Sequence, residues 1–192
     1  MKRLLCFLTG GHRYADKNLV SCPSHKLFHT TLHNECVKCG KPIEFEINIG
    51  QISDVDTIAR FQVAMALETE GMTLDLDRVT RGVTAAMHDE SKGRYVVLRQ
   101  SGEVIGSLML TKEWSDWNCQ WYWWIQSVYV TPQHRGRGVY KAMYSKVKAM
   151  AANENVSQIR LYVDKINQRA QRVYEKLGMS ETHYLMYEVA EL

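Results

Sequence analysis

The chain has 192 residues, of which 45% are hydrophobic and 23% are charged. This composition is typical of a globular protein and excludes long disorder, and the length predicts one full-sized domain with a small appendage. The net charge of +3 is too small to indicate nucleic-acid binding by itself. Apolar runs are shorter than the ~20 residues that span a bilayer. Leu4–Leu8 is too short for a secretory signal, so we expect a cytoplasmic protein with no membrane partner.

Basic residues and metal-ligand residues are concentrated at the N-terminal end. Residues 1–44 contain seven Lys and Arg against three Asp and Glu, which gives +4, whereas the remainder contains 17 against 18, which gives −1. The same segment holds most of the cysteines and histidines of the chain: Cys6, Cys22, Cys36, Cys39, His12, His25, His29 and His33. We therefore expect a small module over residues 1–43 and a larger domain over residues 44–192.

The small module has the ligand types of a structural zinc site. Cys36 and Cys39 form a Cys-x-x-Cys pair followed by a glycine, in which two thiolates meet one cation at a tight turn. About forty residues bury too little apolar surface to fold without such a ligand. The second ligand pair is either Cys6 with His12 or Cys22 with His25, and the spacing alone does not choose between them.

Three short motifs of this module resemble the zinc-ribbon-like proteins common in phage and prophage genomes. They are Leu4-Leu5-Cys6, Gly11-His12-Arg13-Tyr14 and Cys36-x-x-Cys39-Gly40-Lys41. The resemblance favours Cys6, His12, Cys36 and Cys39 as the zinc ligands. It also suggests that the protein is phage-encoded and acts in the host cytoplasm.

The larger domain alternates between strand-like and helical patterns. Apolar residues at helical spacing predict helices over residues 55–67, 74–87, 136–150 and 168–177. Alternating or short apolar runs predict strands over residues 44–49, 94–98, 104–110, 121–130, 159–163 and 184–189. Helices between strands indicate an α/β fold with a mixed sheet, in which the crossover through residues 136–150 joins two parallel strands.

The segment between the strand 121–130 and the following helix carries an anion-binding pattern. Gly136 and Gly138 allow a ligand to approach the backbone closely, and the first amides of the helix point outward. The helix dipole favours a negative charge at this position, and Arg135 and Arg137 add positive charge. The segment is therefore expected to bind a pyrophosphate.

Two motifs in this order resemble the GNAT acetyltransferase superfamily. Gln133-x-x-Gly136-x-Gly138, entered by Val128-Tyr129-Val130, is similar to the family's acyl-CoA loop. The run from Asn167 to Met179, which ends in Tyr-Glu-Lys-Leu-Gly-Met, is similar to a later helix of the family. The resemblance covers residues 45–192 and implies transfer of an acetyl group from acetyl-CoA to an amine.

The resemblance also implies roles for individual residues. The cofactor's pyrophosphate and pantetheine arm are expected to lie against the loop and the strand edge, formed by Val128, Tyr129, Val130, Gln133, His134, Arg135, Gly136, Arg137, Gly138 and Val139. Asn167 is expected to hydrogen-bond the cofactor. Tyr174 is expected to touch its sulfur and to protonate the departing thiolate. The family parts two strands near this loop, and the sequence shows no bulge that would do so.

The general base is chosen by position rather than by motif. Glu113 is the leading candidate because it follows the predicted strand 104–110, and Glu70 and Asp116 are alternatives. The aromatic run over residues 121–124 places Trp121 with Trp123 on one strand face and Tyr122 with Trp124 on the other. One face is expected to be core, and the other, with Trp114 and Trp117, is either core as well or the wall of an amine pocket.

Three classes of function fit this sequence. The first is an amine acetyltransferase, and acidic loops at residues 67–72 and 113–118 favour a cationic acceptor in it. The second is a nucleic-acid-associated modifier that docks through the basic zinc module. The third is a noncatalytic module that binds CoA. Neither the acceptor nor the oligomeric state can be inferred from the sequence.

Overall fold

The computed structural model describes residues 34–35, 42–43 and 45–189. The chain divides into two compact units, one ending at Leu161 and one beginning at Tyr162. The first unit contains a two-stranded antiparallel pair, β1 (Asn34–Glu35) with β2 (Pro42–Ile43), and a five-stranded sheet. Among the described residues, no helix is long and apolar enough to cross a membrane.

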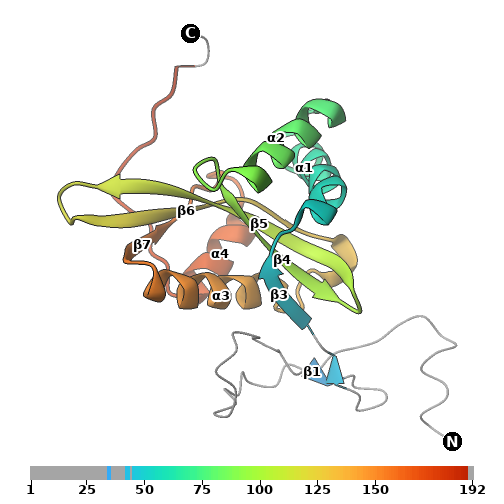
Figure 1. The fold of residues 1–192 in the computed structure, drawn as a ribbon. Coiled ribbons are helices and arrows are strands. Elements are labelled where there is room, and N and C mark those ends of the chain that lie inside the picture. The colour runs from blue at the N-terminus through green and yellow to red at the C-terminus, as the bar shows by residue number, and fades with distance from the viewer. Residues whose placement is uncertain (1–33, 36–41, 44, 190–192) are drawn as a thin grey trace, which may run out of the picture. The chain divides into compact units, whose positions relative to one another are not determined.

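The five-stranded sheet has the strand order β3-β4-β5-β6-β7 (Figure 1). Neighbouring strands are antiparallel except for β6 and β7, which are parallel and are joined through α3. The mixed sheet and the parallel crossover confirm the fold predicted from the sequence. The strands are β3 (Phe45–Ile49), β4 (Arg94–Gln100), β5 (Glu103–Ser115), β6 (Gln120–Val130) and β7 (Val156–Arg160).

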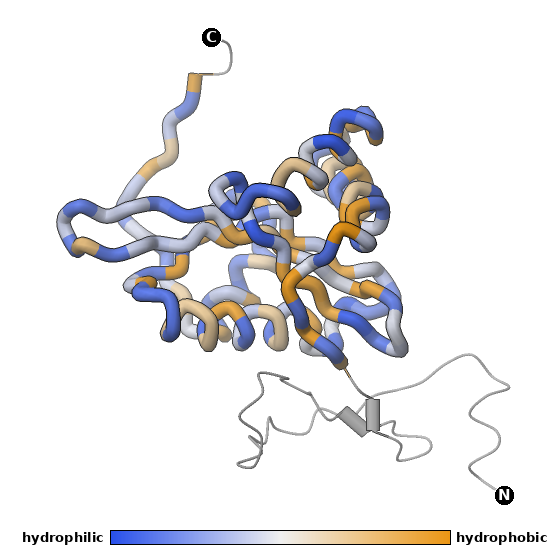
Figure 2. Tube along the Cα trace, in the orientation of Figure 1, coloured by the Kyte–Doolittle hydropathy of each residue, from blue (hydrophilic) through white to orange (hydrophobic). Residues whose placement is uncertain are grey.

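Helices cover both faces of this sheet (Figure 1). On one face, α1 (Val55–Glu70) and α2 (Leu76–His88) pack against a buried cluster that includes Val97 and Tyr129. On the other face lies α3 (Val139–Asn153), whose Met143 is fully buried. In Figure 2 the central strands carry long hydrophobic stretches, whereas the free end of the β5–β6 hairpin is mainly hydrophilic. The core therefore lies along the middle of the sheet.

A short ion pair holds the start of α1 against the sheet. Both carboxylate oxygens of Asp54 lie 2.6 Å from the Nη2 atom of Arg99 on β4. The Asp54 side chain is buried, and it also accepts a hydrogen bond from the backbone N–H of Gln51. A buried carboxylate with these partners fixes where α1 begins.

The second unit is described by itself. It contains α4 (Gln168–Lys176), whose N-cap residue is Asn167. Its described residues form no other helix or strand. The predicted last strand over residues 184–189 is wrong, because these residues join no described ladder and their apolar side chains are exposed. Apolar alternation predicts a strand only where a partner strand covers one face.

Two strand boundaries also differ from the prediction. β5 continues five residues past the predicted end at Leu110, so Glu113 lies in a strand rather than in a loop. β7 begins at Val156, three residues before the predicted start. The long β5 pairs with β6 as far as Ser115, beyond the part of the sheet that β4 covers.

Gly106 on β5 determines how closely α3 approaches the sheet. A Cβ atom at this position would lie 2.9 Å from Cγ1 of Val139 and 3.3 Å from the carbonyl oxygen of Tyr129. We expect Gly106→Ala to lower the free energy of unfolding by about 1–3 kcal/mol, because the start of α3 must move away. Urea unfolding measures this change.

The matched control is Gly82→Ala in α2, where no heavy atom lies within 4 Å of the added Cβ. Alanine in a helix interior is more stable than glycine by about 0.5–1 kcal/mol, so this variant should unfold at higher urea. Equal stability changes in the two variants would contradict the proposed contact between β5 and α3.

Candidate active site

The loop between β6 and α3 has the geometry of an anion site. After the short 3₁₀ turn Pro132–His134, Gly136 and Gly138 adopt left-handed φ angles of 74° and 78°, which glycine adopts at little cost. Gly138 is the N-cap of α3, no side chain caps the helix, and its first turn contains no acidic residue. A Cβ added at either glycine would have no heavy atom within 4 Å. No side chain therefore takes up the first amides of α3, and uncapped amides at the start of a helix favour an anion.

Arg135 braces this loop instead of extending from it. Its Nε donates to the carbonyl oxygen of Val130 at 2.8 Å, and its Nη2 lies 2.6 Å from Oε2 of Glu68 at the end of α1. Its guanidinium also lies 5.4 Å from the centre of the Tyr129 ring. The sequence placed Arg135 at the mouth of the loop as a positive charge, and the structure adds a carboxylate partner.

Glu68 is the site residue that sequence reasoning missed. Besides Arg135, it accepts a hydrogen bond from the Tyr129 hydroxyl at 3.2 Å. The Tyr129 ring packs 4.9 Å from that of Phe61, which lies two helical turns before Glu68 on α1. Burial raises the pKa of Tyr129, and the Glu68 carboxylate adds to that rise. The helical spacing of Phe61 and Glu68 was the one available signal that both face β6.

A β-bulge interrupts β6 directly before the loop. The register with β5 shifts between Ser107 and Met109, and Ser127 has a left-handed φ of 53°. The ladder between β6 and β7 ends at the pair Trp124 and Arg160. Among the described residues, the edge of β6 after Trp124 is therefore not paired with β7. Backbone groups on such an edge can pair with an extended ligand.

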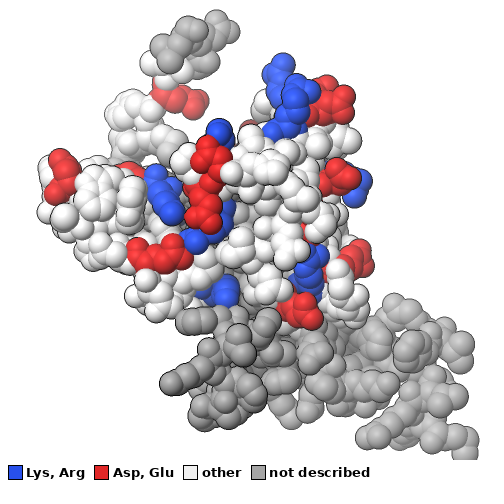
Figure 3. Space-filling model, in the orientation of Figure 1, with Lys and Arg blue, Asp and Glu red and all other residues white. Residues whose placement is uncertain are grey.

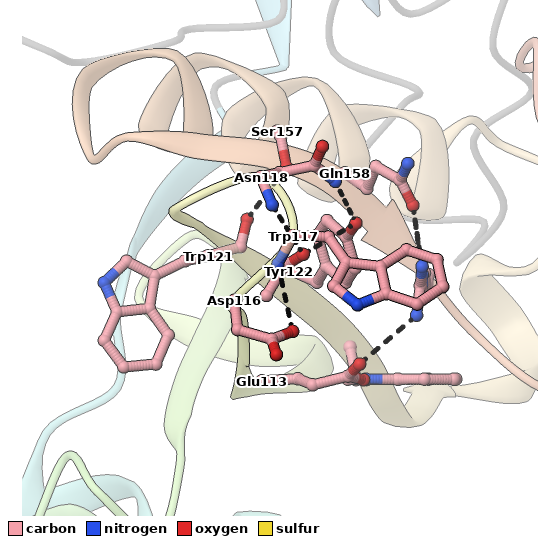
Figure 4. A network of polar contacts seen from close by, with 11 residues as sticks. Glu113, Asp116, Trp117, Asn118, Trp121, Tyr122, Ser157 and Gln158 are labelled. Atoms are coloured by element: carbon pink, nitrogen blue, oxygen red, sulfur yellow. Dashed lines mark hydrogen bonds and ion pairs between the residues drawn. The ribbon is translucent and has the colours of Figure 1, made fainter.

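A polar and aromatic strip continues from the bulge toward the hairpin end. Thr111 accepts a hydrogen bond from Gln126 at 2.7 Å, and Oε2 of Glu113 accepts one from the Trp124 indole N–H at 2.5 Å. Arg160 lies 3.4 Å from the other oxygen of Glu113. Figure 4 shows the part of this network around Glu113, to which β5, β6 and β7 each contribute side chains.

The structure places the three candidate bases apart. Glu113 is held by Trp124 and Arg160, as just described. Asp116 lies in the turn of the β5–β6 hairpin and accepts a hydrogen bond from the backbone N–H of Trp117. Glu70 is the exposed last residue of α1. Of these three, only Glu113 belongs to the strip.

The aromatic residues divide between the two faces of the hairpin. Trp123 is buried in the core, with the Arg94 guanidinium 4.9 Å from its ring centre. Trp114 packs edge-on against Trp121 at 4.9 Å, on the face opposite Tyr122 and Trp124. Trp114 therefore shares a face with Trp121 rather than with Tyr122 and Trp124. Trp117 is 91% exposed at the hairpin turn.

The second unit contains the two remaining predicted residues. The side-chain oxygen of Asn167 caps α4 by accepting a hydrogen bond from the backbone N–H of Ala170 at 3.0 Å. Tyr174 is partly buried, and burial raises the pKa of its phenol. The phenol therefore stays protonated at neutral pH. Neither observation tests a contact with a cofactor, so both roles stay predictions.

The predicted zinc ligands Cys6, His12, Cys36 and Cys39 lie outside the described residues, as do Cys22 and His25. Within the described residues, no three His, Cys, Asp or Glu side chains are arranged to hold a metal ion. The zinc module stays a prediction, as does the nucleic-acid alternative that depends on its charge. On the face in Figure 3, acidic and basic side chains of the described residues are intermixed.

Fold and loop together define an α/β protein with a glycine loop between β6 and the start of α3. The chain matches the model of the acetyltransferase (GNAT) family over residues 60–179. It resembles a possible acetyltransferase from Clostridium difficile 630, with 42% identity and a TM-score of 0.73 over 77% of this chain and 98% of that one. The chain therefore belongs to the acetyltransferase (GNAT) family.

Two further relatives show how far this similarity extends. A GCN5-related N-acetyltransferase from Ralstonia eutropha JMP134 is 22% identical, with a TM-score of 0.63 over 77% of this chain and 99% of that one, and it shows the fold alone. The thialysine N-ε-acetyltransferase of Mus musculus is 36% identical over 58 residues, which are 30% of this chain and 34% of that protein. The chain thus matches about a third of this curated relative.

The pKa of His134 tests the structure of the loop between β6 and α3. Its Nδ1 lies 2.7 Å from the Thr131 hydroxyl, and burial, followed by the positive charge of Arg137, lowers its pKa below 6.5. A lowered pKa in the folded protein stabilises the fold above pH 6.5, and this stabilisation is lost as the pH falls through the folded pKa. We expect Arg137→Gln to raise the pKa of His134, as measured by NMR titration. An unchanged pKa would contradict this placement of Arg137.

Proposed function

We propose that this protein transfers an acetyl group from acetyl-CoA to an amine by direct attack in a ternary complex. The observation that carries the proposal is the continuity of the glycine loop with the unpaired edge of β6, in a chain of the acetyltransferase (GNAT) family. A phosphate site and an open strand edge in line suit a ligand with a pyrophosphate at one end and an extended arm at the other.

The cofactor's pyrophosphate would lie on the amides of residues 133–139. Two of these positions are glycines with room for a ligand atom where a Cβ would stand. The pantetheine arm would pair with the edge of Val128, Tyr129 and Val130, which continues from the loop toward the bulge. Affinity would then come mainly from backbone groups, with Arg135 holding the loop in shape through Glu68.

The reaction needs a neutral amine beside the thioester carbon. The new C–N bond forms as the C–S bond breaks, the base removes one proton from the amine, and the departing thiolate takes one from an acid. Tyr174 is our candidate acid. A phenol has an ordinary pKa near 10, above that of a thiol at ~8.5, so this transfer depends on close positioning.

Glu113 stays our candidate base. Its two carboxylate oxygens accept one contact each, from Trp124 and from Arg160, so each oxygen keeps a lone pair that can take a proton. The long contact of 3.4 Å to Arg160 is the weaker of the two.

The acceptor is a primary amine in this proposal. The name of the mouse relative states that it acetylates the ε nitrogen of thialysine, which supports a side-chain amine as the acceptor here. The acidic residues at the end of α1, Glu68 and Glu70, favour a cationic acceptor. A small molecule and a protein lysine both satisfy this chemistry.

A calorimetric titration with acetyl-CoA tests the proposed cofactor site. We expect saturable binding to the natural chain and at least about tenfold weaker binding to Gly136→Glu, because the new carboxylate would repel the pyrophosphate. Gly102→Glu is the matched control, since Gly102 also has a positive φ, of 82°, and open space around its Cβ position. Loss of binding in both variants, or in neither, would refute the assignment of the loop.

A pH–rate profile separates the acid from the base. Glu113→Gln should lower kcat by about 10²-fold or more and remove the rise of the rate with pH, because the base acts when deprotonated. Tyr174→Phe should lower kcat at every pH up to about 10 without moving the profile, because burial keeps the phenol protonated there. Acetyl-CoA affinity should change little in either variant. An unmoved profile in Glu113→Gln would remove Glu113 as the base.

A further inference from the structure

Arg160 is the least satisfied of the arginines that pair with carboxylates in the described part of the chain. Its Nη1 lies 3.4 Å from Oε1 of Glu113, whereas Arg135 and Arg99 approach their carboxylates to 2.6 Å. Arg94 lies 3.0 Å from Glu154. Charge-assisted N–H···O contacts are ordinarily about 2.7–2.9 Å long, so the Arg160 contact is a weak one.

The guanidinium of Arg160 is nevertheless held in a fixed position. Its Nε and Nη2 both donate to Oε1 of Gln158, at 3.1 and 2.9 Å. Its central carbon lies 3.9 Å from the centre of the Tyr122 ring and 5.8 Å from that of Trp124. An arginine that is already stacked on aromatic rings loses little further side-chain freedom when it binds a ligand.

The aromatic platform under Arg160 is itself fixed. Tyr122 is buried, and its hydroxyl accepts hydrogen bonds from the Ser115 hydroxyl at 3.1 Å and from the Asn118 side-chain amide. Figure 4 shows Asn118 and Tyr122 turned toward each other. Side chains that are held in this way keep the guanidinium in one orientation.

Arg160 keeps hydrogen-bonding capacity for a ligand. A guanidinium has five N–H donors, and the contacts with Gln158 and Glu113 use three of them. Its side chain is 29% exposed, so it is not sealed in the core. Two N–H groups on one planar cation are complementary to a carboxylate.

The position of Arg160 in the sheet links it to the proposed acceptor site. The pair Trp124 and Arg160 is the last rung before β6 and β7 stop pairing. Glu113, Tyr122 and Trp124 lie on the same sheet face as Met109, which packs against the core under α1 and α2. The open edge of β6 begins at this rung, so a group on Arg160 lies at one end of that edge.

We propose that Arg160 binds a carboxylate of the acceptor, so that the substrates are amines that also carry a carboxylate, such as basic amino acids. This inference rests on the proposed function. The incoming carboxylate would replace Glu113 at Nη1 of Arg160, and the Glu113 carboxylate would keep its bond to the Trp124 indole N–H. The Trp124 indole therefore reports directly on the site.

Matched pairs of amines test this proposal by binding and by turnover. Lysine and ornithine differ from cadaverine and putrescine only by the carboxylate. In a chain saturated with CoA, lysine or ornithine should shift the Trp124 indole resonance saturably, and at concentrations at least about tenfold lower than the two diamines need. Arg160→Gln should weaken that binding by at least about tenfold and abolish the preference for lysine over cadaverine.

Two further variants guard against an indirect effect. Arg160→Lys keeps the charge but loses the planar fork, so it should recover only part of the affinity. Arg94→Gln removes an arginine that is also paired with a glutamate and placed over a tryptophan, and it should keep the preference for lysine over cadaverine. Loss of that preference in Arg94→Gln would show that general destabilisation explains the result.

Equal responses to carboxylated and decarboxylated amines, or unchanged lysine binding in Arg160→Gln, would overturn the proposal. So would the absence of any Trp124 response to lysine and ornithine in the natural chain. Failure of the proposed function is a separate result, because it would appear as absent acetyl-CoA binding. The indole titration without CoA would still show whether Arg160 takes a carboxylate.

Discussion

The bulge at Ser127 is the constraint on which the rest of the site depends. Side chains of a regular strand alternate between faces, so an extra residue exchanges the faces of everything after it. Gln126 and Tyr129 therefore point to the same face, as shown by their β5 partners Met109 and Ser107. Without the bulge, Tyr129 would turn away from Phe61 and Glu68. The cost is a left-handed φ at a residue other than glycine.

Tyr129 connects α1 to the glycine loop between β6 and α3. Its ring packs on Phe61 of α1, its hydroxyl donates to Glu68, and Glu68 in turn holds Arg135. The end of α1, which carries the loop proposed to contact the acceptor, is thus tied to the loop proposed to bind the cofactor. Because the ion pair is partly exposed, it contributes position more than stability.

The sequence predicted those parts of this arrangement that depend on local chemistry. Two glycines between a strand and a helix, an amphipathic α1 and a parallel crossover each have a local pattern, and the fold confirms the helix and the crossover. The bulge has no such pattern, because nothing local marks Ser127 for a left-handed conformation. The pair of Glu68 and Arg135 joins residues 67 positions apart. Contacts of this kind follow from tertiary packing and not from spacing.

The length of β5 also depends on tertiary pairing that the sequence pattern does not reveal. This length decides which side chains lie beside Trp124. The strand-like pattern ends at Leu110, yet pairing with β6 carries β5 on to Ser115. This extension converts Glu113 from a loop residue into one with a fixed face beside Trp124. β7 then stops pairing at Arg160, opposite the same tryptophan. A carboxylate, an indole and a guanidinium on adjacent strands are therefore brought together by where two strands end, and the chemistry of the proposed acceptor site would follow from those two strand ends.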